Sequence, residues 1–188
     1  MANQSMKKDF LLALVLVVAG TIIFTVLFGF RLQTPPLEES GGRAQLKVGE
    51  IAPPIQAAGW VNGNPVQNQS LKGKVIVVDA WATWCGPCRQ QAPHIVKTYQ
   101  KFKDQKVAFV GLTSDGEDLL PEIREWLKET GISWPNGYGA IESLIAFKAD
   151  TIPQVWVIGT DGRVVWNVDS ELTESLEEGI SRALKQAE

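Results

Sequence analysis

The sequence predicts a three-layer α/β domain in which helices flank a mixed central sheet. Two largely apolar runs are each followed by a segment of helical periodicity, namely Val75–Trp81, which is apolar apart from Asp79, and residues 107–115. Such runs are typical of parallel strands that are buried on both faces. An Asp-Gly pair then separates residues 155–159 from residues 163–168, which predicts an antiparallel hairpin. A parallel pair with an antiparallel edge gives a mixed sheet.

Four segments are expected to be helical. A helix begins near Pro87, and Pro93 is expected to kink it. An amphipathic helix follows and ends at Gly131, and a short helix is expected over residues 140–149. The last helix should begin at Thr173 as its N-cap.

The start of the globular part has turn signals rather than a long periodic pattern. The stretch WVNGNPV at residues 60–66 places a turn between apolar flanks, which predicts an added N-terminal β-hairpin. The preceding segment, residues 31–46, contains paired Pro, paired Gly and acidic residues, so we expect a flexible tether. The folded domain is therefore predicted to span residues 47–188.

Residues 10–30 form an uncharged apolar run that predicts a transmembrane signal-anchor helix. A helix of this length spans about 31 Å, close to the thickness of the hydrocarbon core. Lys7 and Lys8 precede the run, which places residues 1–9 in the cytoplasm and the domain on the extracytoplasmic, periplasmic side. The alternative is a cleaved signal peptide, whose apolar region is usually shorter and ends in small residues.

Charge and composition argue against two classes of function. The chain has a formal net charge of −3 and no basic cluster, whereas a nucleic-acid partner requires a cationic surface. A structural zinc site needs about four nitrogen or sulfur ligands. The sequence offers two Cys and one His, His94, which is expected at a solvated position. We therefore expect no metal, no cofactor and no nucleic acid.

Both cysteines lie in the stretch WCGPC, as Cys85 and Cys88. A purely structural disulfide would close a loop of only a few residues and gain little chain entropy. Two merely packed cysteines are also possible, but the motif lies at a strand-to-helix junction rather than on an apolar face. A redox-active dithiol is the favoured interpretation.

The position of the pair gives the two sulfurs different roles. Cys85 is expected in the first turn of a helix, where unpaired N–H groups and the helix dipole favour thiolate over thiol. Cys88 lies one turn later on the same side and can reach Cys85. Cys85 is therefore the expected attacking, more exposed sulfur, and Cys88 the resolving one. Gly86 and Pro87 complete the loop, and proline suits an early helical position.

Asp79 interrupts the first apolar strand, six residues before Cys85. One possibility is a carboxylate at the strand end that reaches water. In an apolar interior, its pKa should instead be raised. It could then accept the proton of Cys88 when that thiol attacks the mixed disulfide.

The stretch VVDAWATWCGPC, with Pro93 five residues after Cys88, resembles the thioredoxin superfamily. The likeness is closer to its membrane-tethered TlpA-like and ResA-like branch, and it covers about residues 47 to 186. This resemblance implies a thioredoxin-like fold and a cis bond between Ile152 and Pro153. It also implies that Trp84, Ile152 and Pro153 contact the substrate.

The chain departs from that branch at two positions. Gln91 stands where many members carry an acidic residue, so a proton-handling role at that position is in doubt. Asp79 stands where many of them have Asn.

The expected function is a membrane-tethered, monomeric thiol–disulfide oxidoreductase that acts outside the cytoplasm. Gly86-Pro87 offers no charge or side-chain donor to stabilise a thiolate further, which favours a reducing protein. The expected partners are disulfide-containing exported proteins as clients, with apocytochrome c as the client that the resemblance implies, a transmembrane electron donor, and the bilayer around residues 10–30. The alternatives are a peroxiredoxin-like peroxidase and a non-enzymatic tethered binding module. No peroxidatic cysteine motif supports the first, and the intact CGPC motif argues against the second.

Overall fold

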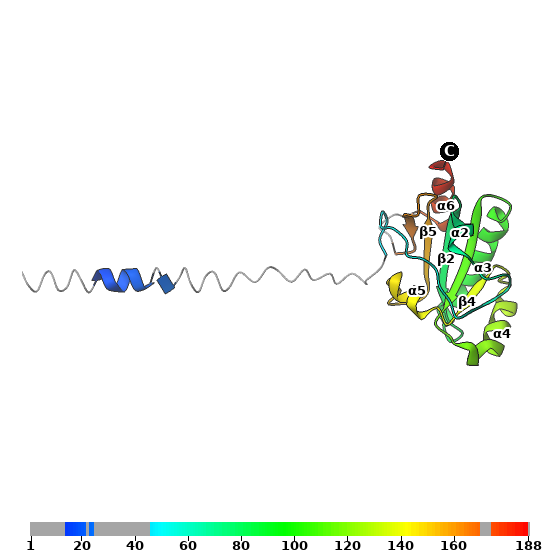
Figure 1. Cartoon of the computed structure of the whole chain (residues 1–188), viewed down its shortest axis with the longest axis horizontal. Coiled ribbons are helices and arrows are strands. Elements are labelled where there is room, and N and C mark those ends of the chain that lie inside the picture. The colour runs from blue at the N-terminus through cyan, green and yellow to red at the C-terminus, as the bar shows by residue number, and fades with distance from the viewer. Residues whose placement is uncertain (1–13, 22, 25–45, 170–173, 188) are drawn as a thin grey trace, which may run out of the picture. The chain divides into compact units, whose positions relative to one another are not determined.

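The computed structural model describes residues 14–21, 23–24, 46–169 and 174–187 (Figure 1). The chain divides into two units, Met1–Gly42 and Arg43–Glu188. In the first unit, residues 14–21 and 23–24 are helical. Within the stretches described, no helix is long and apolar enough to cross a membrane. The rest of the predicted anchor, and the predicted tether up to residue 45, lie outside the described residues.

A six-stranded sheet with the order β1-β4-β3-β2-β5-β6 forms the centre of the second unit. Strands β2 (Val75–Trp81) and β3 (Val107–Thr113) are parallel, in register over their full length. On the other side of β2 runs β5 (Gln154–Ile158), antiparallel to it, and β6 (Val164–Asn167) pairs with β5. Gly162 has a φ of 80° in the turn between these two strands, a conformation that glycine adopts without strain. The predicted mixed sheet is confirmed.

The predicted N-terminal hairpin is wrong, because the added element is a single strand. Strand β1 (Gly59–Val61) pairs antiparallel with β4 (Asn136–Tyr138), which lies far from it in the sequence. The residues that follow the Asn62-Gly63 turn do not form a strand that pairs with β1. Pro65 has no amide hydrogen to donate to a ladder, and the chain continues into the short helix α2 (Asn68–Leu71).

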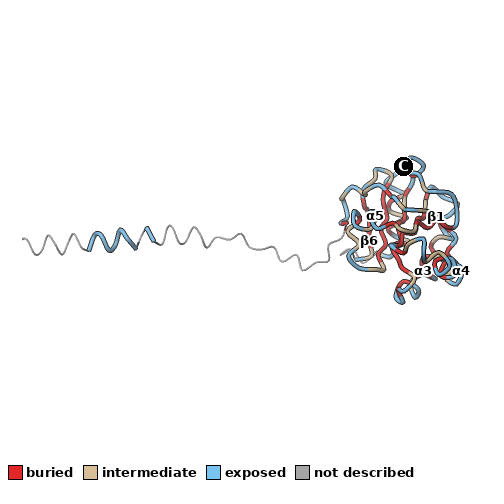
Figure 2. The backbone as a smooth tube through the Cα atoms, turned by 60° about the horizontal axis from the view of Figure 1, so that its bottom comes forward, coloured by how far each residue is buried: buried red, intermediate tan, exposed pale blue. Residues whose placement is uncertain are grey.

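Helices cover both faces of the sheet. Buried residues are concentrated inside the domain and exposed ones on its outside (Figure 2). One face packs against α3 (Gly86–Phe102), α4 (Leu120–Thr130) and α6 (Leu176–Lys185). The opposite face packs against α2, α5 (Ile141–Ala146) and the segment that starts at Leu46. Alternate residues of β2 face opposite sides, so Val77 and Trp81 belong to the first core, and Val78 and Ala80 to the second.

The predicted helices occur with small differences at their ends. Pro93 lies inside α3 without ending that helix. A short 3-10 turn, η1 (Glu117–Leu119), precedes α4, and Gly131 ends α4 in the left-handed conformation, as expected. The short helix expected over residues 140–149 is α5.

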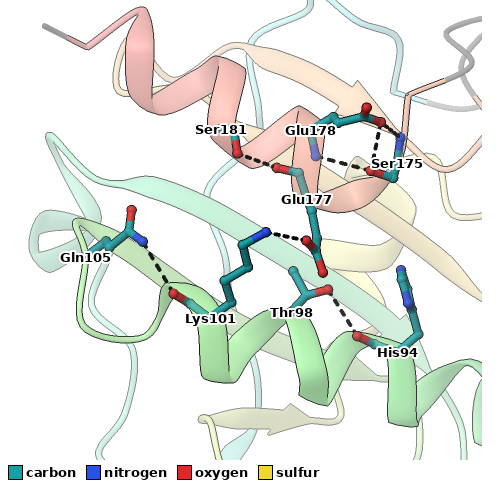
Figure 3. Close-up of polar contacts among 8 residues, drawn as sticks. All are labelled: His94, Thr98, Lys101, Gln105, Ser175, Glu177, Glu178 and Ser181. Atoms are coloured by element: carbon teal, nitrogen blue, oxygen red, sulfur yellow. Dashed lines mark hydrogen bonds and ion pairs between the residues drawn. The ribbon is translucent and has the colours of Figure 1, made fainter.

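Ser175, rather than Thr173, is the N-cap of α6. Its hydroxyl accepts the backbone N–H of Glu178 at 3.3 Å, and the Glu178 carboxylate accepts the backbone N–H of Ser175 at 2.7 Å (Figure 3). This reciprocal pair is a capping box. Thr173 lies outside the described residues. Lys101 of α3 also reaches Glu177 at 2.5 Å and links the two helices (Figure 3).

We expect Ser175→Ala to lower the free energy of unfolding by about 1 kcal/mol, because the first turn of α6 loses its side-chain acceptor. Urea unfolding measures this difference. Ser181→Ala is the matched control, since the Ser181 hydroxyl donates to the Glu177 carbonyl within the helix (Figure 3). That change should stay within about 0.5 kcal/mol. Equal losses in the two variants would show that the cap contributes nothing.

Candidate functional site

The two cysteines lie where the central strand gives way to helix α3. Cys85 is the N-cap of α3, and Cys88 lies in its first turn. They form a disulfide with their Cα atoms 5.3 Å apart, and the backbone N–H of Cys88 donates to Cys85 Sγ at 3.1 Å. Pro87 is the second residue of the helix, where the missing N–H removes no helical hydrogen bond. The positive end of the helix is therefore directed at Cys85 Sγ.

Both cysteines are buried, so exposure does not distinguish the attacking sulfur from the resolving one. Cys85 is 3% exposed and Cys88 is 4% exposed, which contradicts the expected difference. The disulfide packs both residues into the core that α3 shares with β2. Gly86 and Pro87 are exposed beside them, and Trp84 is 72% exposed. This loop is therefore the solvent-exposed side of the pair.

Asp79 is buried in the middle of the sheet, between Gly111 of β3 and Val155 of β5. By strand alternation it faces the same side of the sheet as Trp81, which is the side that carries Cys85 and Cys88. Desolvation of its carboxyl group raises the pKa of Asp79 from 3.8 to about 7. A group with this pKa can gain or lose a proton near neutral pH, as a general acid or base must.

A buried polar contact fixes Trp81 near the end of the same strand. The Trp81 indole N–H donates to the Asn136 side-chain oxygen at 2.9 Å, and the indole stacks on Trp126 with ring centroids 3.9 Å apart. Gly111 makes room for this contact, because a Cβ at that position would lie 1.7 Å from the Asn136 oxygen. Trp81 is a core residue, as the sequence predicted, but Asn136 was not anticipated.

Asp115 is a second buried polar residue that sequence reasoning missed. Its carboxylate accepts the backbone N–H of Thr83 at 2.7 Å, and its carbonyl oxygen accepts the N–H of Gly139 at 2.7 Å. One residue therefore links the loop before Cys85 to the loop before α5. Its position just beyond β3 was the available signal, because the carboxyl ends of adjacent parallel strands lie at one edge of the sheet.

The Ile152–Pro153 peptide bond is cis, as the resemblance implied. Ile152 and Trp84 line one cavity of about 400 Å³, together with residues from α5. Cys85 and Pro153 do not line it, although Cys85 adjoins Trp84 and Pro153 adjoins Ile152. The structure therefore brings Trp84 and Ile152 together at the edge of the cysteine loop.

The Redoxin family profile matches residues 47–180, which is most of the chain. The chain belongs to the Redoxin family. A thiol-disulfide oxidoreductase ResA from Bacillus thuringiensis (strain Al Hakam) is 26% identical over 178 residues, covering 93% of this chain and 96% of the relative.

Solved structures agree with this assignment. A thiol:disulfide interchange protein of the thioredoxin family from Chlorobium tepidum is 27% identical with a TM-score of 0.58, covering 77% of this chain and 99% of that one. The thioredoxin domain of a Bacteroides vulgatus thiol-disulfide oxidoreductase is 22% identical, with a TM-score of 0.59 and coverage of 75% and 97%, and supports the fold alone. This Redoxin-family chain is a thiol–disulfide oxidoreductase with a thioredoxin-like fold, which confirms the resemblance seen in the sequence.

Two further polar residues follow the cysteines on α3 of this Redoxin-family enzyme. Gln91 is partly buried, and within the part of the chain that the structure describes its Oε1 has no hydrogen-bond partner. His94 is exposed, as expected. Among the described residues, no group of three or more His, Cys, Asp or Glu side chains could hold a metal ion.

A second cavity is lined by Trp84 and by residues of α4. It is also about 400 Å³ and includes three carboxylates, those of Glu122, Glu125 and Glu129. Arg89 lines it as well and forms an ion pair with Glu129. Trp84 therefore lines both this acidic cavity and the one that Ile152 lines.

Proposed function

We propose that this enzyme is anchored in the cytoplasmic membrane and reduces disulfides in exported proteins on the extracytoplasmic side. The observation that carries the proposal is the Cys85–Cys88 pair at the start of α3, on the same side of the sheet as a buried carboxyl group with a pKa of about 7. This arrangement provides an activated sulfur, a second sulfur to release the client, and a group that can hold the transferred proton.

In the proposed cycle, the Cys85 thiolate attacks one sulfur of a client disulfide. A mixed disulfide forms, and the other client sulfur leaves as a thiolate. Cys88 then loses its proton to Asp79 and attacks Cys85 Sγ. The second client sulfur leaves, two electrons have passed to the client, and Cys85–Cys88 remains as the disulfide present in the structure. A membrane-embedded dithiol donor restores the reduced pair.

Trp84, Ile152 and Pro153 are the proposed client contacts. Trp84 is exposed beside Cys85, and Ile152 lines the cavity that Trp84 also lines. The Ile152–Pro153 bond is cis and directly precedes β5. Apocytochrome c is the proposed client, because its haem-attachment site contains a Cys-x-x-Cys pair.

The uncharged run of residues 10–30 supports the membrane location. The Bacillus thuringiensis relative aligns over 93% of the chain, so the similarity extends into the segment before the Redoxin region. Carbonate extraction of membranes tests the anchor. The protein should stay in the pellet, and its release into the supernatant would contradict this part of the proposal.

Insulin reduction with dithiothreitol as donor, together with the reduction potential of the pair, tests the proposed direction. We expect catalysis of insulin precipitation by the full-length protein and a potential closer to about −270 mV, typical of a reducing protein, than to about −120 mV. The reason is that Gly86-Pro87 adds no group that stabilises the reduced form. A potential near about −120 mV would make the enzyme an oxidant instead.

A further inference from the structure

The cavity between Trp84 and α5 has an apolar rim that the redox cycle does not explain. Its lining includes Ile141 and Ile145, which are 57% and 72% exposed. Of the five large apolar side chains exposed within residues 46–169 and 174–187, three line this cavity, namely Trp84, Ile141 and Ile145. Single exposed apolar residues are ordinary, but several that meet at one cavity mark a binding surface.

Helix α5 is held firmly in place, so this wall of the cavity is formed before any client binds. The Ser143 hydroxyl accepts the N–H of Gln56 at 2.6 Å and donates to its carbonyl at 2.7 Å. Phe147 is fully buried at the end of the helix. Ile141 and Ile145 are one turn apart on the solvent side. A preformed surface loses little conformational entropy on binding, which favours its use in recognition.

Asp115 connects this wall to the catalytic loop. Its carboxylate holds the N–H of Thr83, next to Trp84, and its carbonyl holds the N–H of Gly139, just before α5. The Ala140 N–H also donates to the Thr113 carbonyl at 2.9 Å. The distance between the cysteine loop and the two isoleucines is therefore fixed by contacts within the domain.

We propose that the cavity binds a bulky apolar side chain of the client, close in sequence to the client cysteine. This deepens the proposed function and depends on it. During exchange the client sulfur lies at Cys85, and a neighbouring client residue is only about 3.3–3.6 Å further along an extended chain. The cavity shares Trp84 and Ile152 with the catalytic edge, so such a residue reaches it directly.

Charge and size argue for this occupant over others. Asp150 is the only ionisable residue among those described that line the cavity, so an acidic client side chain would be desolvated and repelled there, and a basic one would meet a single exposed carboxylate. A second copy of the chain is disfavoured because the exposed apolar surface consists of three side chains, those of Trp84, Ile141 and Ile145, whereas a stable interface takes about 20–30 residues from each partner.

Disulfide-linked peptides test the proposal on the full-length protein in detergent. Three peptides of equal length carry Leu, Ser or Lys beside the cysteine, and bis(2-hydroxyethyl) disulfide reports the cysteine chemistry alone. We expect the wild type to prefer the Leu peptide over the Ser peptide by about tenfold in kcat/KM. Ile145→Ser and Ile141→Ser should each reduce this preference to about threefold or less, with the rate on the small disulfide changed less than twofold.

Ile51→Ser is the matched control, since Ile51 is 66% exposed and does not line the cavity. It should keep the full preference for the Leu peptide. Equal use of the Leu and Ser peptides by the wild type, or an unchanged preference in Ile145→Ser, would overturn the inference. Preference for the Lys peptide over the Leu peptide would also overturn it, because recognition would then depend on a carboxylate, either Asp150 or one in the acidic cavity against α4. A dimer abolished by Ile145→Ser would overturn it as well, because the exposed apolar surface would then serve self-association. If the wild type reduces neither the peptides nor the small disulfide, the proposed function itself fails.

Discussion

Replacing Cys88 with alanine is expected to leave the enzyme covalently joined to its clients. Without the second sulfur, the mixed disulfide on Cys85 can be released only by an external thiol, so it should accumulate. Non-reducing electrophoresis of membranes that contain Cys88→Ala should show bands that disappear when a reductant is added. Mass spectrometry of those bands identifies the exported clients. Turnover of insulin disulfides should be lost almost completely.

Cys85→Ala is the control for the trapping experiment. It keeps a cysteine in the first turn of α3 but lacks the sulfur that accepts the Cys88 N–H hydrogen bond. It should form few mixed disulfides and have no reductase activity. If Cys85→Ala traps clients as well as Cys88→Ala does, either sulfur can attack and the assignment of distinct roles fails, and trapping by Cys85→Ala alone would reverse it.

Asp79→Asn is expected to stabilise the oxidised protein at alkaline pH and to change its stability little near pH 4. Burial raises the pKa of Asp79 from 3.8 to about 7, so between these values the folded state holds a proton that the unfolded state has lost. Stability therefore falls as the pH rises through this window, by at most about 4 kcal/mol, on the order of 1.4 kcal/mol for each pH unit. Asn cannot ionise and avoids the loss.

Urea unfolding of the wild type and Asp79→Asn at pH 4 and pH 8 measures this difference. The exposed residue Asp104 provides the control, and Asp104→Asn should give the same small change at both pH values. A stability gain in Asp79→Asn that is equal at pH 4 and pH 8 would mean that the buried carboxyl group is not the source of the pH dependence.

The same substitution should slow release of the mixed disulfide. If Asp79 accepts the Cys88 proton, its loss should reduce the resolution rate at pH 7 by tenfold or more, and the inflection near pH 7 should disappear from the pH profile. Stopped-flow measurement with a preformed mixed disulfide separates this step from the first attack. An unchanged rate and profile would assign the proton to another acceptor.

The catalytic centre could be predicted from the sequence because its signals are local. CGPC at the end of an apolar run specifies a strand, a turn and a helix start within a few residues, and the structure has all three. Asp79 was conspicuous for the same reason, as one acidic residue in a buried strand. The Asp161-Gly162 pair predicted the β5–β6 hairpin for the same reason, because a turn signal between two apolar runs is local.

The errors and omissions concern contacts between residues that are distant in the chain. The turn at Asn62-Gly63 suggested a local hairpin, whereas β1 pairs with β4 at Asn136–Tyr138. Local turn residues carry no information about a distant pairing edge. Asn136 and Asp115 are ordinary polar residues in the sequence, and only the folded chain shows that they hold Trp81 and Thr83. The exposure of Cys85 was misjudged because the closed disulfide packs it into the core.

Strand β2 pairs with β3 over its full length and with β5 over most of it, and Cys85 follows the end of β2 after three residues. The outermost strand β1, by contrast, has three residues and one partner. Thermal fraying therefore begins at the β1 margin, while amide protons of β2 exchange with solvent only in the rarest, largest openings. The redox pair is thus attached to the strand with the most extensive pairing, and we expect disulfide exchange at Cys85 and Cys88 to continue while the periphery of the domain fluctuates.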